Sequence, residues 1–237
     1  MQCNILQVVS IALLIPQIYF VAKTDPIPTV RYFTQKKVHL GMGKLKVPKN
    51  GNRKDLIVKA GAALFREKGF GAASMRDLAE NLGIEAASLY NHIRSKNEIL
   101  ESVCFNVANR FNLHLDEIES GSLSPIKKIE TLLRFHIQQM IDNYEEVIVS
   151  DREWKHLDEP YRSNFHTQRR NYRKRFAAII EEGMKKGEIK KIDEPTAVVI
   201  MLHSVSGIES WHRSTAKISA AELEDNMVLI MIDGLRK

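Results

Sequence analysis

The chain of 237 residues contains only two cysteines, Cys3 and Cys104, which lie far apart in the sequence. Two separated thiols provide neither a disulfide framework nor the paired cysteines of a metal site. The sequence therefore excludes a disulfide-stapled scaffold, and the reducing cytoplasm is the expected compartment.

Catalytic sequence motifs are also missing. The chain has eight histidines and 29 acidic residues, but it contains no nucleophile elbow, no HExxH pair and no glycine-rich phosphate loop. We therefore expect a protein that is not an enzyme and that holds no metal and no cofactor.

Strand-like alternation of apolar and polar residues is absent, as are internal repeats and low-complexity tracts. Apolar residues recur instead at steps of three and four, which is the period of an α-helix. The sequence therefore predicts an all-α fold.

The most informative stretch runs from Ser74 to Lys96. Ser74 precedes a helical pattern, and Asp77 follows three positions later, so the two side chains can satisfy the first free amides reciprocally. Apolar residues share one face as far as Leu82, and Gly83 follows where a left-handed residue ends a helix without strain. A short helix is therefore expected to begin at Ser74 and end at Leu82.

A second short helix is predicted from Glu85 or Ala86 to Ile93, with Leu89 and Ile93 facing the core. Its other face presents small residues and then hydroxyl, amide and imidazole groups, which can meet phosphates or base edges. This outward set is Ala86, Ala87, Ser88, Tyr90, Asn91 and His92. Such a helix suits the major groove of DNA, although two short helices around a glycine turn also occur as ordinary packing units.

Charge and flanking helices favour DNA binding over simple packing. Helices are predicted before the turn, at 53–69, and after it, at 96–119. Residues 42–96 carry eleven lysines and arginines against five acidic residues, a net charge of +6, whereas residues 97–237 carry 20 against 23. Positive charge is thus concentrated where phosphates are expected.

The segment GAALFREKGFGAASMRDLAENLGIEAASLYNHIRSKNEIL resembles the DNA-binding domain of the TetR family of bacterial regulators. The glycine after the first helix, the capped second helix, the Leu89-Tyr90-x-His92 core and the Ser95-Lys96 pair sit where that family has them. The resemblance implies backbone contacts near the second helix, base contacts from the third, and phosphate contacts from Tyr90, His92 and Lys96. The implied DNA-binding residues are Arg53, Ser74, Met75, Arg76, Ala86, Ala87, Ser88, Tyr90, Asn91, His92 and Lys96, with Glu85 as a further position near bases.

Ala86 and Ala87 depart from the polar residues that some members carry at these positions. Direct base hydrogen bonds should therefore be few on this helix. Thymine-methyl contacts and DNA shape are expected to carry more of the sequence preference.

Residues 1–41 do not fit this pattern, because Ile5–Ala22 is almost continuously apolar and is broken by Pro16. A signal peptide is disfavoured, since no lysine or arginine precedes Lys23. A membrane-spanning or membrane-proximal segment is marginal at this length. We favour a start of translation at Met42, because the 196 residues that remain are the length expected of a TetR-like regulator.

The rest of the chain divides into further helical segments, predicted at 126–144, 145–157, 161–186, 195–213 and 219–234. We therefore expect an extension at 1–41, a helix-turn-helix DNA-binding domain at 42–96 and a helical domain for ligand binding and dimerisation at 97–237.

Two arginines, Arg162 and Arg169, lie on an otherwise apolar stripe of the helix predicted at 161–186. A buried guanidinium needs a carboxylate, a route to solvent or a ligand anion. Asp151 and Glu153 are the candidate internal partners.

The region VSDREWKHLDEPYRSNFHTQRRNYRKRFAAIIEEGMKKGEI, together with GIESWHR, resembles the C-terminal domain of TetR-like regulators of sterol and fatty-acid catabolism. In that subgroup acyl-CoA thioesters release the protein from DNA. The resemblance implies an apolar pocket for an acyl chain with cations near its anionic groups. Candidate lining residues are Phe105, Phe135, His136, Met140, Trp154, Arg162, Phe165, Arg169, Tyr172 and Trp211; the uncharged ones also suit a plain core, and His136 suits a hydrogen-bonded core histidine.

The last two predicted helices are more apolar than a peripheral pair should be. Their apolar residues are Val198, Val199, Met201, Leu202, Val205, Ile208, Trp211, Leu223, Met227, Ile230 and Met231. Small residues at Ser204, Ser206 and Gly207 would allow close approach of a second copy. We expect a homodimer through these helices, as in the resembled family, and an inverted-repeat operator in double-stranded DNA.

The sequence thus predicts a ligand-responsive repressor in which the helix at 96–119 connects the ligand pocket to the DNA-binding domain. Two alternatives stay open: a drug-sensing efflux repressor of the same family, and a DNA-binding structural or cell-division factor without an inducer.

Overall fold

The computed structural model describes residues 53–215 and 218–237. Regular structure in these ranges is helical, with one isolated antiparallel bridge between Ile189 and Arg236, so the predicted all-α fold is confirmed. Every helix in these two ranges is too short or too polar to span a lipid bilayer. The expectations for residues 1–41 lie outside the described ranges.

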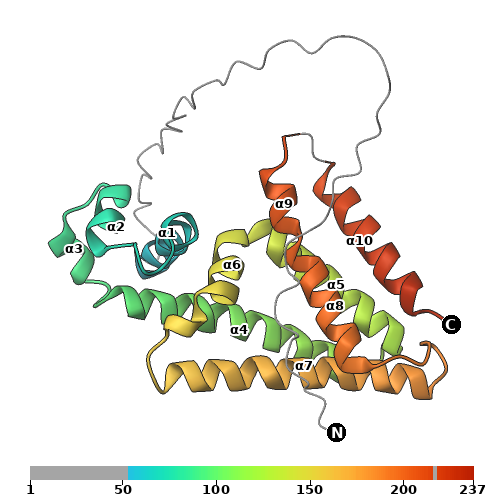
Figure 1. Ribbon diagram of the computed structural model, residues 1–237. Coiled ribbons are helices and arrows are strands. Elements are labelled where there is room, and N and C mark those ends of the chain that lie inside the picture. Colours follow the sequence, from blue (N-terminus) through green and yellow to red (C-terminus); the bar gives the residue numbers. More distant parts are fainter. Residues whose placement is uncertain (1–52, 216–217) are drawn as a thin grey trace, which may run out of the picture. The chain divides into compact units, whose positions relative to one another are not determined.

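The first four helices form the helix-turn-helix region and the long helix that follows it (Figure 1). Ile57, Leu64 and Phe65 of the first helix are buried. The four helices are α1 Arg53–Lys68, α2 Met75–Leu82, α3 Ala86–Tyr90 and α4 Lys96–Ser120.

The third helix is shorter than predicted, because α3 ends at Tyr90 rather than at Ile93. The amides of His92 and Ile93 both donate to the carbonyl of Leu89, at 3.0 and 3.1 Å, which closes the chain into a turn. Ile93 nevertheless remains buried, since the turn carries it back into the core.

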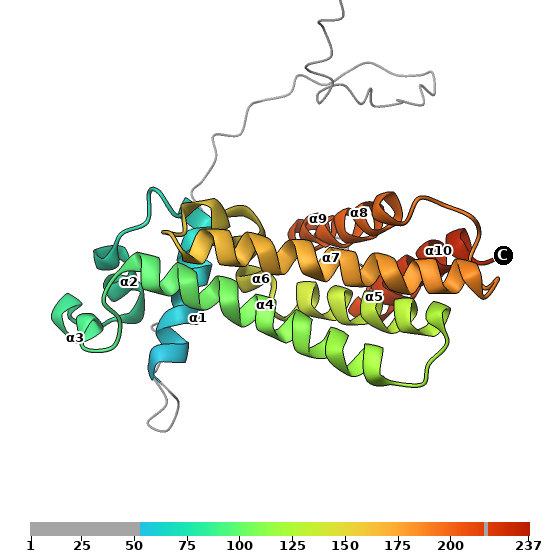
Figure 2. The same cartoon turned by 90° about the horizontal axis from the view of Figure 1, so that it is seen from below.

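Helical segments also make up the remainder of the described chain, and Figure 2 shows α4 and α7 lying side by side. Helix α5 packs against α7, α8 and α10 and so lies at the centre of the C-terminal core. The segments are α5 Pro125–Asp142, α6 Tyr144–Arg152, the 3-10 turn η1 Trp154–His156, α7 Tyr161–Lys185, α8 Glu194–Ser206, α9 Ile208–Arg213 and α10 Ala220–Leu235.

Two predicted helices are divided in the structure. The segment at 195–213 breaks at Gly207 into α8 and α9, and the segment at 145–157 breaks at Glu153 into α6 and η1. Local backbone hydrogen bonds accompany both breaks. The spacing of apolar residues cannot predict such breaks, because it depends only on which side chains share a face.

Buried apolar residues form two clusters. One fills the space between α5, α7, α8 and α10. The other joins the helix-turn-helix to the C-terminal helices, because it includes Val149 of α6 and Phe165 of α7 beside the core of α1–α4. The helix-turn-helix region is therefore packed directly onto α6 and α7.

Candidate functional site

Local hydrogen bonds fix the start of α2 at Ser74. The amide of Asp77 donates to the Ser74 hydroxyl at 3.2 Å, and the amide of Ser74 donates to the Asp77 carboxylate at 2.9 Å. Lys68 donates to the same carboxylate at 2.8 Å. The hydrogen bonds from Lys68 and Ser74 lower the pKa of Asp77 to about 2, so the cap stays charged at neutral pH.

Gly83 ends α2 in the left-handed conformation, with φ of 65°. This turn presents α3 with Leu89 fully buried against the core. On its other side Ala87, Tyr90 and Asn91 are exposed, and Ala86, Ser88 and His92 are partly exposed. Ala87, Ser88 and Tyr90 thus face solvent on α3, and Asn91 and His92 follow in the turn after it, where base and phosphate contacts are possible. Ala86 instead packs partly against the core.

The predicted phosphate-binding residues outside α3 differ in their surroundings. Arg53 and Arg76 are exposed at the surface, Ser74 is exposed at the tip of α2, and Met75 is partly buried. Arg76 lies on the first turn of α2, next to the helix N-terminus, where a phosphate is favoured.

Lys96 has a partner within the fold. Its ammonium group donates to the carbonyls of Phe70, Gly71 and Ala73, at 2.9, 3.3 and 3.2 Å. It also lies 4.6 Å from the centre of the Phe70 ring. The lysine therefore holds the loop between α1 and α2 onto α4, and its contact with phosphate stays a prediction.

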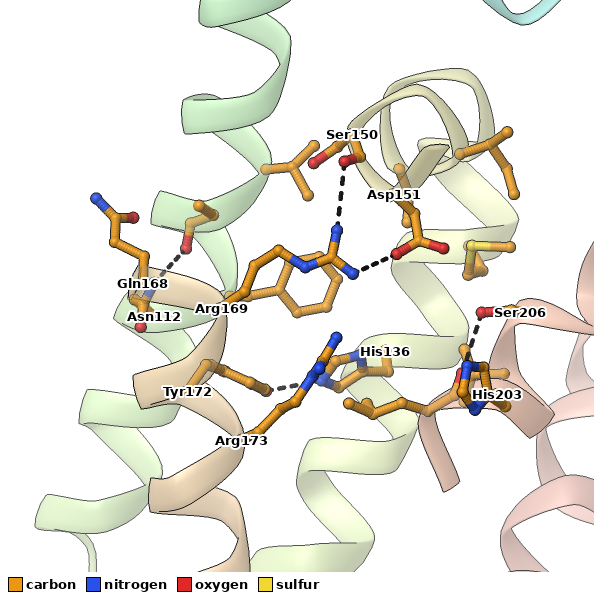
Figure 3. Close-up of a pocket in the computed structure, with 18 of the residues that line it drawn as sticks. Asn112, His136, Ser150, Asp151, Gln168, Arg169, Tyr172, Arg173, His203 and Ser206 are labelled. Carbon is orange, nitrogen blue, oxygen red and sulfur yellow. Dashed lines mark hydrogen bonds and ion pairs between the residues drawn. The ribbon is translucent and has the colours of Figure 1, made fainter. Parts of the chain in front are cut away.

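A cavity of about 320 Å³ lies between α4, α5, α6, α7 and α8. Figure 3 shows its polar side chains, which come from all five helices. Its lining includes five of the ten residues predicted from the sequence: His136, Met140, Phe165, Arg169 and Tyr172. It is lined further by Val107, Ala108, Phe111, Asn112, Val147, Ile148, Ser150, Asp151, Gln168, Arg173, Val199, Leu202, His203, Val205 and Ser206.

Four predicted lining residues lie outside both cavities and make other contacts. Phe105 packs edge-on against Phe165 at 5.8 Å between ring centres, and Phe135 stacks on His114 at 4.0 Å. The indole nitrogen of Trp211 donates to the carbonyl of Ile218 at 2.9 Å.

Arg162, the fourth, is exposed and forms an ion pair with Glu159 at 2.7 Å. It therefore has neither of the acidic partners proposed from the sequence, Asp151 and Glu153. The carboxylate that pairs with Arg162 belongs to Glu159, only three residues earlier in the chain, next to the exposed start of α7.

His136 and Tyr172 face each other on the cavity wall, with 2.7 Å between the imidazole Nε2 and the phenolic oxygen. Burial, with a smaller contribution from His114, lowers the pKa of His136 to about 3. Burial also raises the pKa of Tyr172. Both groups are therefore neutral at physiological pH, which suits an apolar occupant.

Arg169 occupies the wall between this cavity and a second one. Its guanidinium lies 2.5 Å from the Asp151 carboxylate and 3.5 Å from the Ser150 carbonyl, so Asp151 is confirmed as a partner. The second cavity measures about 450 Å³ and is strongly basic. It is lined by Trp154, His166, Arg169, Arg170, Arg173, Lys174, Ala177, Pro195, Val198 and Val199.

Arg173 is an exposed residue of α7 and lines both cavities. Partial burial of its guanidinium, and then the charge of Arg169, lower the pKa of Arg173, whereas the charge of Asp151 raises it. The sequence reasoning also missed the α8 residues of the wall, such as His203, because nothing in the periodicity of α8 distinguishes a cavity wall from core. Among the described residues, no group of three or more histidines, cysteines or acidic residues is placed to hold a metal ion.

Comparison with known proteins finds two matching family models. Residues 57–103 match the model described as "Bacterial regulatory proteins, tetR family", and residues 122–235 match "Tetracyclin repressor-like, C-terminal domain". The chain is 23% identical over 186 residues to the HTH-type transcriptional repressor KstR2 of Mycolicibacterium smegmatis, covering 78% of this chain and 91% of that protein.

Two solved structures share the fold. The ketosteroid transcriptional regulator KstR2 of Mycobacterium tuberculosis superposes with a TM-score of 0.73 at 20% identity, covering 79% of this chain and 96% of that one. AibR in complex with isovaleryl coenzyme A and operator DNA gives a TM-score of 0.67 at 20% identity, covering 76% and 97%.

Proposed function

The chain belongs to the TetR family of DNA-binding transcriptional regulators, and from that membership we propose that it is a ligand-responsive repressor. In this proposal it binds an inverted-repeat operator as a homodimer, and a small molecule releases it. Its DNA-binding domain is the segment 42–96, and its ligand-binding and dimerisation domain is 97–237.

Helix α3 is the proposed recognition helix. Ala86, Ala87, Ser88 and Asn91 would lie at base edges, where the two alanines offer methyl contacts to thymine rather than hydrogen bonds. Around them the phosphates would be held by Arg53, Ser74, Met75, Arg76, Tyr90, His92 and Lys96.

Dimerisation through α8 and α10 is supported by their exposed apolar side chains. Ile200 on α8 and Ile230 on α10 are 59% and 73% exposed, and Val199 and Leu229 are also largely exposed. This exposed set differs from the sequence expectation, because Val198, Met201, Val205 and Ile208 are buried in the core of the protomer. A two-fold dimer would set two copies of α3 on one face of DNA, about 34–36 Å apart or slightly more.

The inducer we propose is an acyl-CoA. The observation that carries this proposal is the pairing of the two cavities, one with buried apolar walls and the other basic, which meet at Arg169 and Arg173. The apolar cavity suits an acyl chain, and the basic one suits the phosphates of coenzyme A. The solved structure of AibR with isovaleryl coenzyme A supports this ligand class by analogy.

Ligand binding is proposed to act through α4, which lines the cavity at Val107 and Phe111 and begins at the DNA reader. A ligand can shift α4 only through differential affinity for the two states. A preference of about 100-fold for the released state supplies nearly 3 kcal/mol.

The test is a fluorescence-anisotropy titration of the full chain with duplexes from its own upstream region, with and without acyl-CoAs of increasing chain length. Tight, salt-sensitive binding that a thioester releases is the expected result. Binding that no thioester disturbs, but that cationic lipophiles release, would replace the acyl-CoA by a drug-like inducer. No binding to any duplex would overturn the proposal.

A further inference from the structure

Helix α6 lies between the cavities and the helix-turn-helix region of α1–α4, which we call the reader. Val147, Ile148, Ser150 and Asp151 line the cavity of about 320 Å³. The same helix packs against both α1 and α4, and its Val149 is 1% exposed within the core of the helix-turn-helix region. A movement of α6 at the cavity therefore changes contacts inside the reader.

The reader side of α6 has defined polar contacts. Glu146 is buried and lies 2.8 Å from Arg110 of α4. At the start of the helix, the guanidinium of Arg66 in α1 lies over the ring of Tyr144, 5.6 Å from its centre. Both neighbouring helices of the reader are thus connected to α6 by charged side chains.

At the opposite end of α6, Arg169 of α7 contacts the last turn of the helix. Its guanidinium donates to Asp151 at 2.5 Å and to the carbonyl of Ser150 at 3.5 Å (Figure 3). It also lies 5.8 Å from the ring centres of both Trp154 and Phe165, so its orientation is fixed from two sides. This ion pair ties α7 to the last turn of α6.

The same guanidinium lines both cavities, so an anion that enters either one meets it. Two cations, Arg169 and Arg173, face a single carboxylate here, which leaves an excess of positive charge. The Asp151 side chain is 50% exposed and the Arg169 side chain is 25% exposed. A half-exposed pair of this kind contributes little and can be exchanged for another anion.

We propose that Asp151 is the counter-ion that the inducer displaces. An anionic group of the ligand takes the Arg169 guanidinium, the last turn of α6 loses its tie to α7, and the freed α6 shifts its contacts with α1 and α4. Asp151 is then a positioning residue that favours the operator-binding state in the absence of ligand. This inference rests on the proposed function, since it names how the same site is regulated.

The test compares Asp151→Asn with Glu159→Gln. Both variants remove one carboxylate from an arginine pair of α7, but Glu159 pairs with the exposed Arg162, away from both cavities. Three quantities are measured in the full chain: operator affinity, affinity for palmitoyl-CoA and coenzyme A, and amide hydrogen exchange in α1 and α6. Asp151→Glu, which keeps the charge, should restore the wild-type values.

In Asp151→Asn, operator affinity and thioester affinity are expected to change in opposite directions. Operator affinity falls about fivefold, whereas affinity for the thioester rises, because the released state is already more populated. Exchange in α1 and α6 becomes faster, and Glu159→Gln changes none of these quantities.

Two outcomes would overturn the inference. One is an Asp151→Asn variant that matches Glu159→Gln in all three measurements, and the other is a parallel loss of operator and thioester affinity, which indicates damage to the fold. If the wild-type protein binds neither palmitoyl-CoA nor coenzyme A, the proposed inducer is wrong. The operator affinity of Asp151→Asn then still tests whether the Asp151–Arg169 pair favours the operator-binding state. If no duplex binds, the proposed function fails, and the exchange measurement alone decides whether Asp151 holds α6.

Discussion

Tyr172 and His136 contact each other across the cavity wall, with 2.7 Å between the phenolic oxygen and Nε2 of the imidazole. The pair joins α7 to α5 in a wall that is otherwise largely apolar. Because the pKa of His136 is lowered to about 3 by burial, this contact has a consequence for stability at mildly acid pH.

Stability should fall as the pH is lowered from about 7 to about 5. The unfolded histidine, with an ordinary pKa of 6.5, takes up a proton in this range, whereas the folded one does not. The free energy of unfolding is therefore lower by about 2 kcal/mol at pH 5 than at pH 7. The midpoint of thermal unfolding should drop by about 4–8 °C from this residue alone.

His136→Gln should remove most of that pH dependence, as measured by thermal unfolding at several pH values. The control is His166→Gln, which changes an exposed histidine of α7. A variant at position 136 that keeps the wild-type pH profile would contradict the assignment of a buried neutral imidazole.

Ser74 has two separable roles, the cap of α2 and a proposed contact with the DNA backbone. Ser74→Ala should cost about 1 kcal/mol of stability, because the first amides of α2 lose their acceptor. Ser74→Gly should cost only roughly a few tenths of a kcal/mol of stability, and it places no second carboxylate beside the charged Asp77. It removes the hydroxyl that would contact the DNA backbone, so operator binding should weaken. Equal operator affinity for the wild type and Ser74→Gly would remove the Ser74 side chain from the DNA interface.

Lys96 and Arg76 should respond differently to substitution. Lys96→Gln loses hydrogen bonds to Phe70, Gly71 and Ala73 as well as the proposed phosphate contact, so both its thermal midpoint and the salt dependence of operator binding should fall. Arg76→Gln should leave the midpoint unchanged and reduce the slope of log affinity against log salt by about 0.9 per protomer. A Lys96→Gln variant that loses stability but keeps the wild-type salt slope would remove Lys96 from the phosphate contacts.

Ile230→Glu should produce a monomer, because it puts a charge into the proposed face of α8 and α10. Sedimentation measures the mass, and operator affinity should fall with it. Leu113→Glu is the matched control: Leu113 is 63% exposed on α4, outside that face. If both variants sediment like the wild type, α8 and α10 are not the interface.

The sequence by itself determined the features that depend on neighbouring residues. The cap at Ser74 and the left-handed turn at Gly83 both use hydrogen bonds or backbone angles within a few residues, so the start and end of α2 were predicted correctly. The apolar spacing also identified Leu89 as buried, because helical geometry decides which side chains share a face. Ile93 is buried as expected too, but through the turn that follows α3 and not through the helix.

Only the tertiary structure decided which similar residues have different surroundings. Arg162 and Arg169 lie on the same predicted stripe of α7, yet one pairs with Glu159 at the surface and the other with Asp151 between two cavities. Periodicity gives the direction of a side chain from its own helix but not the helix that packs opposite it. The carboxylates, carbonyls and cavities that Arg169 and Lys96 meet come from segments distant in the chain, and packing alone brings them together.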